Sequence, residues 1–325
     1  MISTFRLFLI DTSENKLFLR RRKILFEHRI KFSFFTRMSS RLLNFLLWIF
    51  LCSIIDFSEE ILFKFRSSTI KVGSFNLRRY SITKASSNTT LNSHISKILH
   101  RYDLIFLQEI IDSSNDNRVV NLLLKHLGQQ SKYEASISPP LGLTSYKERL
   151  VFLYRRKSSR LKILSSYVYN GSVSQYFERP PFILQTKFSS TADSTIFVGV
   201  HLKPDHVYNE FRHLKTVINE LKHGSAIVIL GDFNADCSYL NNAKKKELRK
   251  TFHDFLWLID DRTETNLLQS CSYDRILVSS GIQPWKKVSW KPNTNGTFPF
   301  DKQFQLSKDA ALQISDHYPV EVDLY

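Results

Sequence analysis

The stretch AIVILGDFNADCSYL, residues 226–240, runs from an apolar segment directly into polar side chains. Ala226–Leu230 has the length and the branched apolar composition of a buried strand. Asp232 and Asn234 come immediately after it. Functional groups concentrate on loops that a rigid scaffold holds in place, so these two residues are candidates for a site.

Other predicted strands carry similar residues at their ends, namely Asn76 after Ile70–Phe75, Glu109 after Asp103–Gln108, His201 in Thr195–His201, and Asp316 with His317 before Pro319–Leu324. One polar residue after a strand is ordinary. Several carboxylates, amides and imidazoles together indicate that these ends meet at one sheet edge. Two carboxylates there can hold a hard cation such as Mg²⁺, and two histidines can transfer protons near neutral pH.

The remaining pattern mixes short strands with amphipathic helices. Further strands are predicted at Arg149–Tyr154, Lys162–Tyr167, Phe182–Phe188 and Asp274–Val278. Helices are predicted at Leu91–Leu99, Arg118–Leu127, Val207–Lys222 and Lys244–Leu256. Because strands and helices do not alternate strictly, the pattern favours an α/β domain with a mixed sheet packed by helices, over residues 69–325.

Composition excludes several classes of protein. The chain has 325 residues, of which 42% are hydrophobic, so it is not wholly disordered. Three cysteines are too few for a disulfide scaffold, and they lack the spacing of a zinc module. A formal net charge of +16 indicates a polyanionic partner, either nucleic acid or an anionic surface.

The amino-terminal part does not look like domain material. Leu42–Ile55 is uncharged and too short to span a bilayer, but it has the length of a signal-peptide core. We therefore predict a signal peptide or an uncleaved signal anchor at residues 38–58, with a buried core helix as the alternative. Residues 1–37 would be a basic, aromatic extension whose translation the sequence leaves open.

Seven segments, in order, carry a resemblance to a known family: FNLRR, FLQEI, SYKERLVFLYR, VHLKP, GDFNADCSYL, CSYDRILV and SDHYPVEV. They resemble deoxyribonuclease I, within the endonuclease/exonuclease/phosphatase superfamily. The resemblance extends from about Ile70 to Leu324. It implies a four-layer α/β sandwich in which two mixed β-sheets pack face to face between outer helices.

The resemblance also implies a mechanism. A divalent cation, Mg²⁺ or Mn²⁺, would be held by Glu109, Asp316 and Asn76 and would offset charge on a phosphodiester. Asp232 and Asn234 would position the water or the phosphate. His201 and His317 would be the acid–base pair. Glu148 would orient His201, and Asp274 would orient His317. From the residues alone, Glu148 would be interpreted as a surface charge and Asp274 as a turn residue.

Double-stranded DNA is the substrate that the resemblance implies, and the positions expected to contact it are Arg78, Tyr146 and Arg179. Ile111 stands where the family commonly has an arginine, so one groove contact is expected to be missing. Chromatin and actin remain open as partners, and we expect a monomer.

Three secondary features follow from the same comparison. Cys237 and Cys271 match the family's main disulfide, which fits an oxidising compartment and secretion. A structural Ca²⁺ site is expected at Asp261, Thr263, Glu264 and Thr265. Asn88, Asn170 and Asn295 are in N-glycosylation sequences.

The predicted activity is that of a secreted endonuclease that leaves 5′-phosphate ends. Two alternatives remain open at this stage. One is a superfamily phosphoesterase that acts on another phosphodiester. The other is a catalytically inactive homologue that binds DNA or actin.

Overall fold

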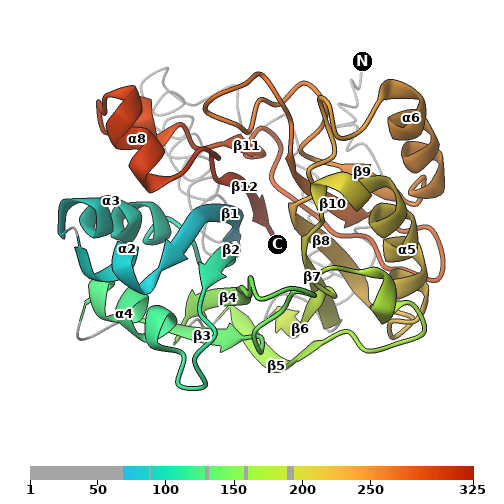
Figure 1. Ribbon diagram of the computed structural model, residues 1–325. Helices are drawn as coiled ribbons and strands as arrows, with labels where there is room; N and C mark the ends of the chain where they lie inside the picture. The colour runs from blue at the N-terminus through green and yellow to red at the C-terminus, as the bar shows by residue number, and fades with distance from the viewer. Residues whose placement is uncertain (1–68, 88, 129–131, 157–159, 189–193) are drawn as a thin grey trace, which may run out of the picture. The chain divides into compact units, whose positions relative to one another are not determined.

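Two six-stranded mixed sheets pack face to face in the computed structural model, which describes residues 69–87, 89–128, 132–156, 160–188 and 194–325 (Figure 1). The first sheet has the order β11(Gly296–Thr297), β12(Val320–Leu324), β1(Ile70–Ser81), β2(Leu104–Ile111), β4(Arg149–Arg155), β3(Tyr133–Ile137). The second has the order β5(Leu161–Val168), β6(Phe182–Phe188), β7(Ser194–His201), β8(Ala226–Asp232), β10(Asp274–Ser279), β9(Phe255–Trp257). Each sheet contains one parallel pair, β1 with β2 and β7 with β8.

Helices form the two outer layers. The first sheet is covered by α2(Ile82–Ser87), α3(Thr89–Leu99), α4(Arg118–His126), α7(Phe300–Gln303) and α8(Lys308–Ile314). The second sheet is covered by α5(Val207–Asn219) and α6(Asn242–Thr251), which Figure 1 shows on the other side of the sandwich. Short 3₁₀ turns lie at Ser174–Tyr176 and Pro204–His206.

Strand β2 shows why the sequence produces this layering. It is apolar at consecutive positions, and successive side chains of a strand point to opposite faces. Leu104 and Phe106 therefore pack into the core between the sheets, while Ile105 and Leu107 pack against the helices. Such a strand is stable only where both of its faces are covered.

Register, rather than loop structure, aligns three polar residues of the second sheet. His201 of β7 is directly opposite Asp232 of β8, and Asp232 is directly opposite Asp274 of β10. Because residues paired across neighbouring strands share a face, these three side chains form a row at one end of the sheet.

The predicted four-layer sandwich of two packed sheets is confirmed, and most of the predicted elements are present. The helix predicted at Lys244–Leu256 is wrong at its end. It stops at Thr251, and Phe255 pairs with Ser279 as part of β9. Strands β3, β9 and β11 and helices α2, α7 and α8 were not predicted, because they are too short to show a hydrophobic period.

The predicted leader at residues 38–58 and the extension at 1–37 lie outside the described residues. Among the residues that are described, no helix combines the length and the apolar character needed to cross a membrane.

Gly199 of β7 offers a test of the packing between the sheets. A Cβ atom at this position would lie 2.3 Å from the ring of Phe106, which itself packs against Phe152. Overpacking of this kind typically costs about 1–3 kcal/mol. We expect Gly199→Ala to lower the free energy of unfolding by that amount in urea denaturation. Gly296→Ala is the matched control, because nothing lies within 4 Å of its added Cβ; equal stability of the two variants would contradict this packing.

Candidate active site

Polar side chains from both sheets meet where the pairing of β1 with β2 shifts register and where β7 and β8 end. Asn76 and Glu109 come from the first sheet, and the row of His201, Asp232 and Asp274 comes from the second. His317 joins them from the segment before β12. The structure therefore brings together groups that are more than 200 residues apart in the chain.

Two carboxylate–imidazole pairs form the centre of the site. His201 Nδ1 lies 2.6 Å from Glu148 Oε1, and His317 Nδ1 lies 2.7 Å from Asp274 Oδ2. In each pair Nδ1 donates to the carboxylate, which fixes the ring and leaves Nε2 facing the other way. Both Nε2 atoms lie 3.7 Å from the same oxygen, Oδ2 of Asp232.

Burial and charge set the protonation of this cluster. Burial lowers the pKa of His317, but Asp274 and Asp232 outweigh it and raise the pKa to about 10. Burial and the Arg179 guanidinium lower the pKa of His201, and Glu148 and Asp232 outweigh them, so the net direction is also upward. Burial alone would raise the pKa of Asp232, yet the two histidines bring it below its usual value.

Asp232 itself is held by the backbone that follows it. Its Oδ1 accepts from the Asn234 amide at 2.9 Å, and Asn234 Nδ2 donates to the Leu202 carbonyl at 2.9 Å. Gly231 precedes it with φ 147°, and a Cβ there would lie 1.9 Å from the Val200 carbonyl oxygen. Only glycine fits, so the glycine of GDFN is required for the close approach of β7 and β8.

Glu109 and Asn76 link the first sheet to the same cluster. Asn76 Nδ2 donates to Glu109 Oε1 at 2.9 Å and to Asp232 Oδ2 at 3.1 Å. The second oxygen of Glu109 accepts from the Arg79 amide at 2.8 Å. Glu109 has φ 57°, and such left-handed backbone is uncommon in residues other than glycine and clusters at functional sites.

Lys84 connects the segment that follows Asn76 to the segment that precedes His317. Its Nζ donates to the carbonyls of Leu77, Arg78 and Ile314 at 2.8–2.9 Å. Burial, and then the nearby Arg78 guanidinium, lower the pKa of Lys84 to about 8 against the carboxylates of Glu109 and Asp316, which act in the opposite direction. Both carboxylates therefore act on the same ammonium group.

Ser315 reinforces this joint. Its hydroxyl donates to the Asn76 carbonyl at 2.6 Å and accepts from the His317 amide at 3.0 Å.

The side chains fit a hard divalent cation. Ligand atoms of Asp232, Asp274 and His317 lie within 4.8 Å of one another. In that group, however, His317 and Asp274 are already hydrogen-bonded to each other. Glu109 and Asp316 supply carboxylate oxygens of the kind that Mg²⁺ prefers. The Asn76 Oδ1 accepts from the Arg78 backbone amide at 2.8 Å while its Nδ2 faces Glu109 and Asp232, so Asn76 would have to turn its amide to offer an oxygen. The assignment of the cation to Glu109, Asp316 and Asn76 stays a prediction.

The three predicted DNA contacts differ in exposure. Tyr146 is 37% exposed. Arg78 is partly exposed, but its Nη1 donates to the Leu312 carbonyl and its Nε lies 3.7 Å from Asp316. Arg179 is 8% exposed; its Nε donates to the His201 carbonyl at 3.0 Å and lies 3.4 Å from Glu148. This burial favours a supporting role for Arg179 over a contact with the groove. Ile111 is partly buried and pairs with Ser81 at the edge of the site.

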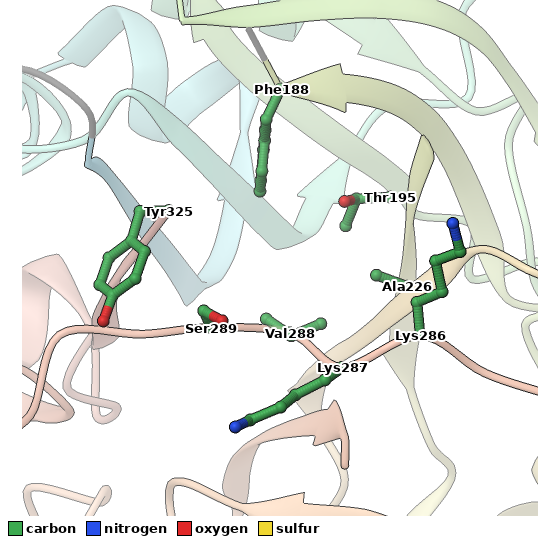
Figure 2. A pocket seen from close by; sticks show the side chains of 8 residues that line it. All are labelled: Phe188, Thr195, Ala226, Lys286, Lys287, Val288, Ser289 and Tyr325. Carbon is green, nitrogen blue, oxygen red and sulfur yellow. The ribbon is translucent and has the colours of Figure 1, made fainter. Parts of the chain in front are cut away.

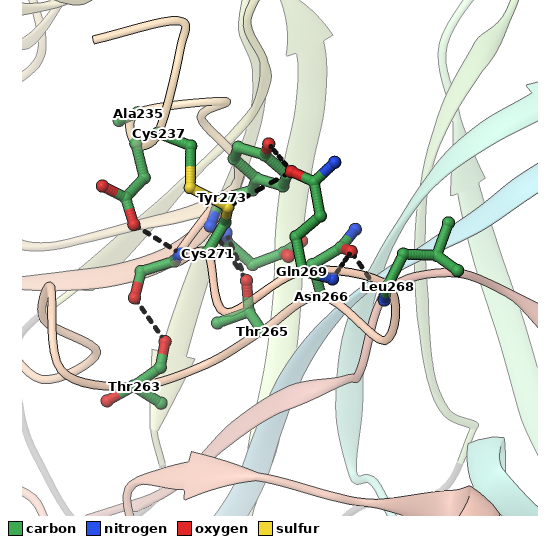
Figure 3. The surroundings of a disulfide bond; sticks show 12 residues. Ala235, Cys237, Thr263, Thr265, Asn266, Leu268, Gln269, Cys271 and Tyr273 are labelled. Carbon is green, nitrogen blue, oxygen red and sulfur yellow. Dashed lines mark hydrogen bonds between the residues drawn. A yellow bond between two sulfur atoms is a disulfide. The ribbon is translucent and has the colours of Figure 1, made fainter. Parts of the chain in front are cut away.

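The predicted disulfide between Cys237 and Cys271 is present, and its surroundings fix Asp274 (Figure 3). The Thr265 hydroxyl accepts from the backbone amides of Tyr273 and Asp274 at 2.9 and 3.0 Å. The disulfide thus ties the segment after β8 to the short segment that leads into Asp274 at the start of β10.

The Ca²⁺ site expected at Asp261, Thr263, Glu264 and Thr265 stays a prediction, and three of these residues have protein partners in this structure. Both oxygens of Asp261 are taken by arginines, Oδ1 by Arg275 and Oδ2 by Arg249. The Thr265 hydroxyl is fully buried and bonded to backbone, and the Thr263 carbonyl accepts from Ser272. Glu264 is exposed. A cation here would compete for Asp261 with the buried guanidinium of Arg275.

Of the three glycosylation candidates, Asn88 lies outside the described residues. Asn170 is exposed in the loop after β5. Asn295 is exposed as well, but its Nδ2 donates to the Leu258 carbonyl at 2.7 Å.

A small pocket at the other end of the strands does not contribute to this site (Figure 2). It holds about 50 Å³ and is lined by Thr195 and Ala226, which begin β7 and β8, whereas His201 and Asp232 end them. A cavity of that size accommodates little more than water.

Sequence reasoning missed three residues of the site, Arg79, Lys84 and Ser315. Arg79 could have been found as the second arginine after Asn76, and Ser315 as the residue before Asp316. Lys84 had no signal, because only the fold shows that it bonds to backbone from two distant segments.

Comparisons with known proteins agree with this geometry. Residues 73–317 match the family described as the endonuclease/exonuclease/phosphatase family. Deoxyribonuclease-1 of Bos taurus is 36% identical over 270 residues, covering 79% of this chain and 92% of that protein. Deoxyribonuclease-1-like 1 of Homo sapiens is 35% identical over 269 residues, covering 79% and 85%, respectively.

Solved structures share the fold at low identity. An endonuclease/exonuclease/phosphatase family protein from Leptotrichia buccalis superimposes with a TM-score of 0.57 at 15% identity, covering 79% of this chain and 99% of that one. TDP2 of D. rerio, complexed with a single-strand DNA product, gives 0.55 at 16% identity, with the same two coverages. The chain therefore belongs to the endonuclease/exonuclease/phosphatase family and, within it, to the deoxyribonuclease I family.

Proposed function

We propose that this deoxyribonuclease-like phosphoesterase is a metal-dependent endonuclease that hydrolyses double-stranded DNA and leaves 5′-phosphate ends. One observation carries the proposal: two carboxylate-bound histidines direct their Nε2 atoms at a single oxygen of Asp232. A phosphate in front of Asp232 would be reached by both imidazoles.

The reaction needs one proton taken and one given. Water attacks phosphorus as a base removes its proton, and the bond to O3′ breaks as an acid protonates that oxygen. His201 and His317 supply the two roles, because Glu148 and Asp274 hold each ring in one orientation. Asp232 and Asn234 position the water or the phosphate between them.

Glu109, Asp316 and Asn76 would hold the divalent cation, Mg²⁺ or Mn²⁺. The cation offsets charge on the phosphate and stabilises the departing oxygen. Asn76 bridges Glu109 and Asp232, so it also sets the position of the cation relative to the acid–base pair.

DNA is favoured over another phosphodiester by charge and by the relatives. Residues 69–325 hold 34 Lys and Arg against 24 Asp and Glu, a net charge of +10 that suits a polyanion, whose non-specific binding is mostly electrostatic. A catalytically inactive role, as a binder of DNA or actin, is disfavoured by the complete set of converging acid, base and ligand residues. Chromatin as the source of DNA and a monomeric state remain proposals.

Secretion is the setting that we propose for this activity. A disulfide beside the catalytic centre fits an oxidising compartment. Residues 38–58 would direct the chain into the secretory pathway, and residues 69–325 would form the nuclease domain.

His317→Ala and Glu109→Gln are each expected to abolish nicking of supercoiled plasmid, with the loss for the histidine about 10²-fold or more. The first variant removes one member of the acid–base pair, and the second removes one negative ligand oxygen. A chelator should have the same effect on the wild-type chain, and added Mg²⁺ should reverse it.

His223→Ala serves as the control, because His223 is exposed and lies beyond α5. Circular dichroism should show unchanged folding in all three variants. Near-normal nicking by either site variant would refute the assignment. Hydrolysis of a lipid phosphodiester in place of plasmid would favour another substrate class.

Lys84→Met tests the joint between the two active-site loops. Three carbonyls would lose their donor, and an unsatisfied buried polar group costs about 1–3 kcal/mol. We expect a lower free energy of unfolding and a lower kcat for nicking. Lys125→Met, at an exposed position of α4, should change neither; an unaltered Lys84→Met enzyme would show that the joint is not needed.

Expression from Met38 in cells with a secretory pathway should deliver active enzyme to the medium. Removal of N-glycans should lower its apparent mass, and Asn170→Gln should remove part of that shift because Asn170 is exposed. Retention of all of the protein inside the cells would contradict the proposed leader.

A further inference from the structure

Two arginines follow Asn76, and the structure uses them differently. Arg78 is committed to the protein through the Leu312 carbonyl and Asp316. Arg79 is exposed, and in the described part of the chain its guanidinium has no ion-pair partner. Its guanidinium carbon lies 5.8 Å from the ring centroid of Tyr146.

The backbone around Arg79 is built to present this side chain. The pairing of β1 with β2 shifts register between Asn76 and Tyr80, and Arg78 and Arg79 have φ 45° and 51°. Consecutive left-handed residues are unfavourable for side chains other than glycine. Here the conformation is held by Glu109, whose Oε2 accepts the Arg79 amide at 2.8 Å.

Arg79 and Tyr146 therefore lie beside the catalytic centre. Burial raises the pKa of Tyr146, and the carboxylates of Glu109 and Glu148 raise it further, while Arg79 and Arg179 act against them. Tyr146 is thus close enough to interact electrostatically with both carboxylates and with the Arg79 guanidinium. A cation stacked near an aromatic ring, with no acidic partner, is suited to a planar anion-binding contact.

We propose that Arg79, oriented by Tyr146, forms a subsite for a backbone phosphate of the substrate strand next to the scissile one. This inference rests on the proposed function. A guanidinium presents paired donors in the geometry of phosphate oxygens, so the contact would be to the DNA backbone and independent of sequence. It would supply binding rather than proton transfer, because Arg79 does not touch the histidines.

The salt dependence of binding tests the subsite. Each neutralised phosphate contributes about 0.9 to the slope of log affinity against log salt concentration. Arg79→Gln should lower that slope by about one, and it should weaken binding of a short fluorescein-labelled duplex by about tenfold at low salt. Arg79→Lys should restore most of the slope. Binding is measured by fluorescence anisotropy in a His317→Ala background, so that the result does not depend on turnover.

Arg212→Gln is the matched control. Arg212 is also exposed and also lies over a tyrosine ring, that of Tyr208 at 5.6 Å, but on the outer helix α5. The Arg212→Gln substitution removes the same charge at a position away from the site. The slope of log affinity against log salt concentration should therefore stay at the wild-type value. Equal slopes for Arg79→Gln and Arg212→Gln would overturn the proposal.

Kinetics on plasmid separate the subsite from a structural effect. Arg79→Gln in the otherwise wild-type chain should raise KM about tenfold and leave kcat unchanged. A loss confined to kcat would overturn the proposal, because it would mean that Arg79 acts by holding Glu109. Absence of nicking by the wild-type chain would instead refute the proposed function, while the anisotropy result would still report on Arg79.

Discussion

The structure depends on a negative charge buried at the meeting point of two sheets. Asp232 is 2% exposed, and a carboxylate in such a place is costly unless other groups compensate it. Two imidazoles, the Asn76 amide and the Asn234 backbone supply that compensation. The Asn234 amide is local, but the two imidazoles and the Asn76 amide come from distant segments, so the charge is fully compensated only when the sandwich has closed.

Closure in turn explains the irregular backbone around the site. Left-handed residues occur at Arg78, Arg79, Glu109 and Asn234, each bordering the cluster. Regular strands would continue past these positions and carry the side chains away from one another. Departures from regular geometry cost energy locally, and the hydrogen bonds of Glu109 and Asp232 with neighbouring backbone amides offset that cost.

The residue pattern was sufficient for an α/β domain with a mixed sheet and for the candidates at strand ends, because apolar strands that run into Asp, Glu or His leave a visible pattern. The four-layer sandwich and the roles of Glu148 and Asp274 came only from the family resemblance. It could not predict what depends on burial or on contacts between distant segments. Asp261 was expected to bind calcium, and no sequence pattern shows that it also accepts a hydrogen bond from the buried Arg275 guanidinium. Arg179 matched a DNA contact, yet its side chain lies inside, beside Glu148. The end of the helix at Thr251 could not be read either, because Phe255 and Leu256 fit a helix and a strand equally well.

The aromatic layer between the sheets sets the distance between the two halves of the site. Asn76 and Glu109 belong to one sheet and Asp232 to the other, while Phe106, Phe152 and Phe182 fill the space that separates them. The thickness of this hydrocarbon layer therefore fixes how far the cation ligands stand from the proton-transfer groups. Misplacement of reacting groups by about 1 Å can cost 10²-fold in rate. A change in the size of these rings would therefore alter the spacing between the two sets of groups without changing any group of the site itself.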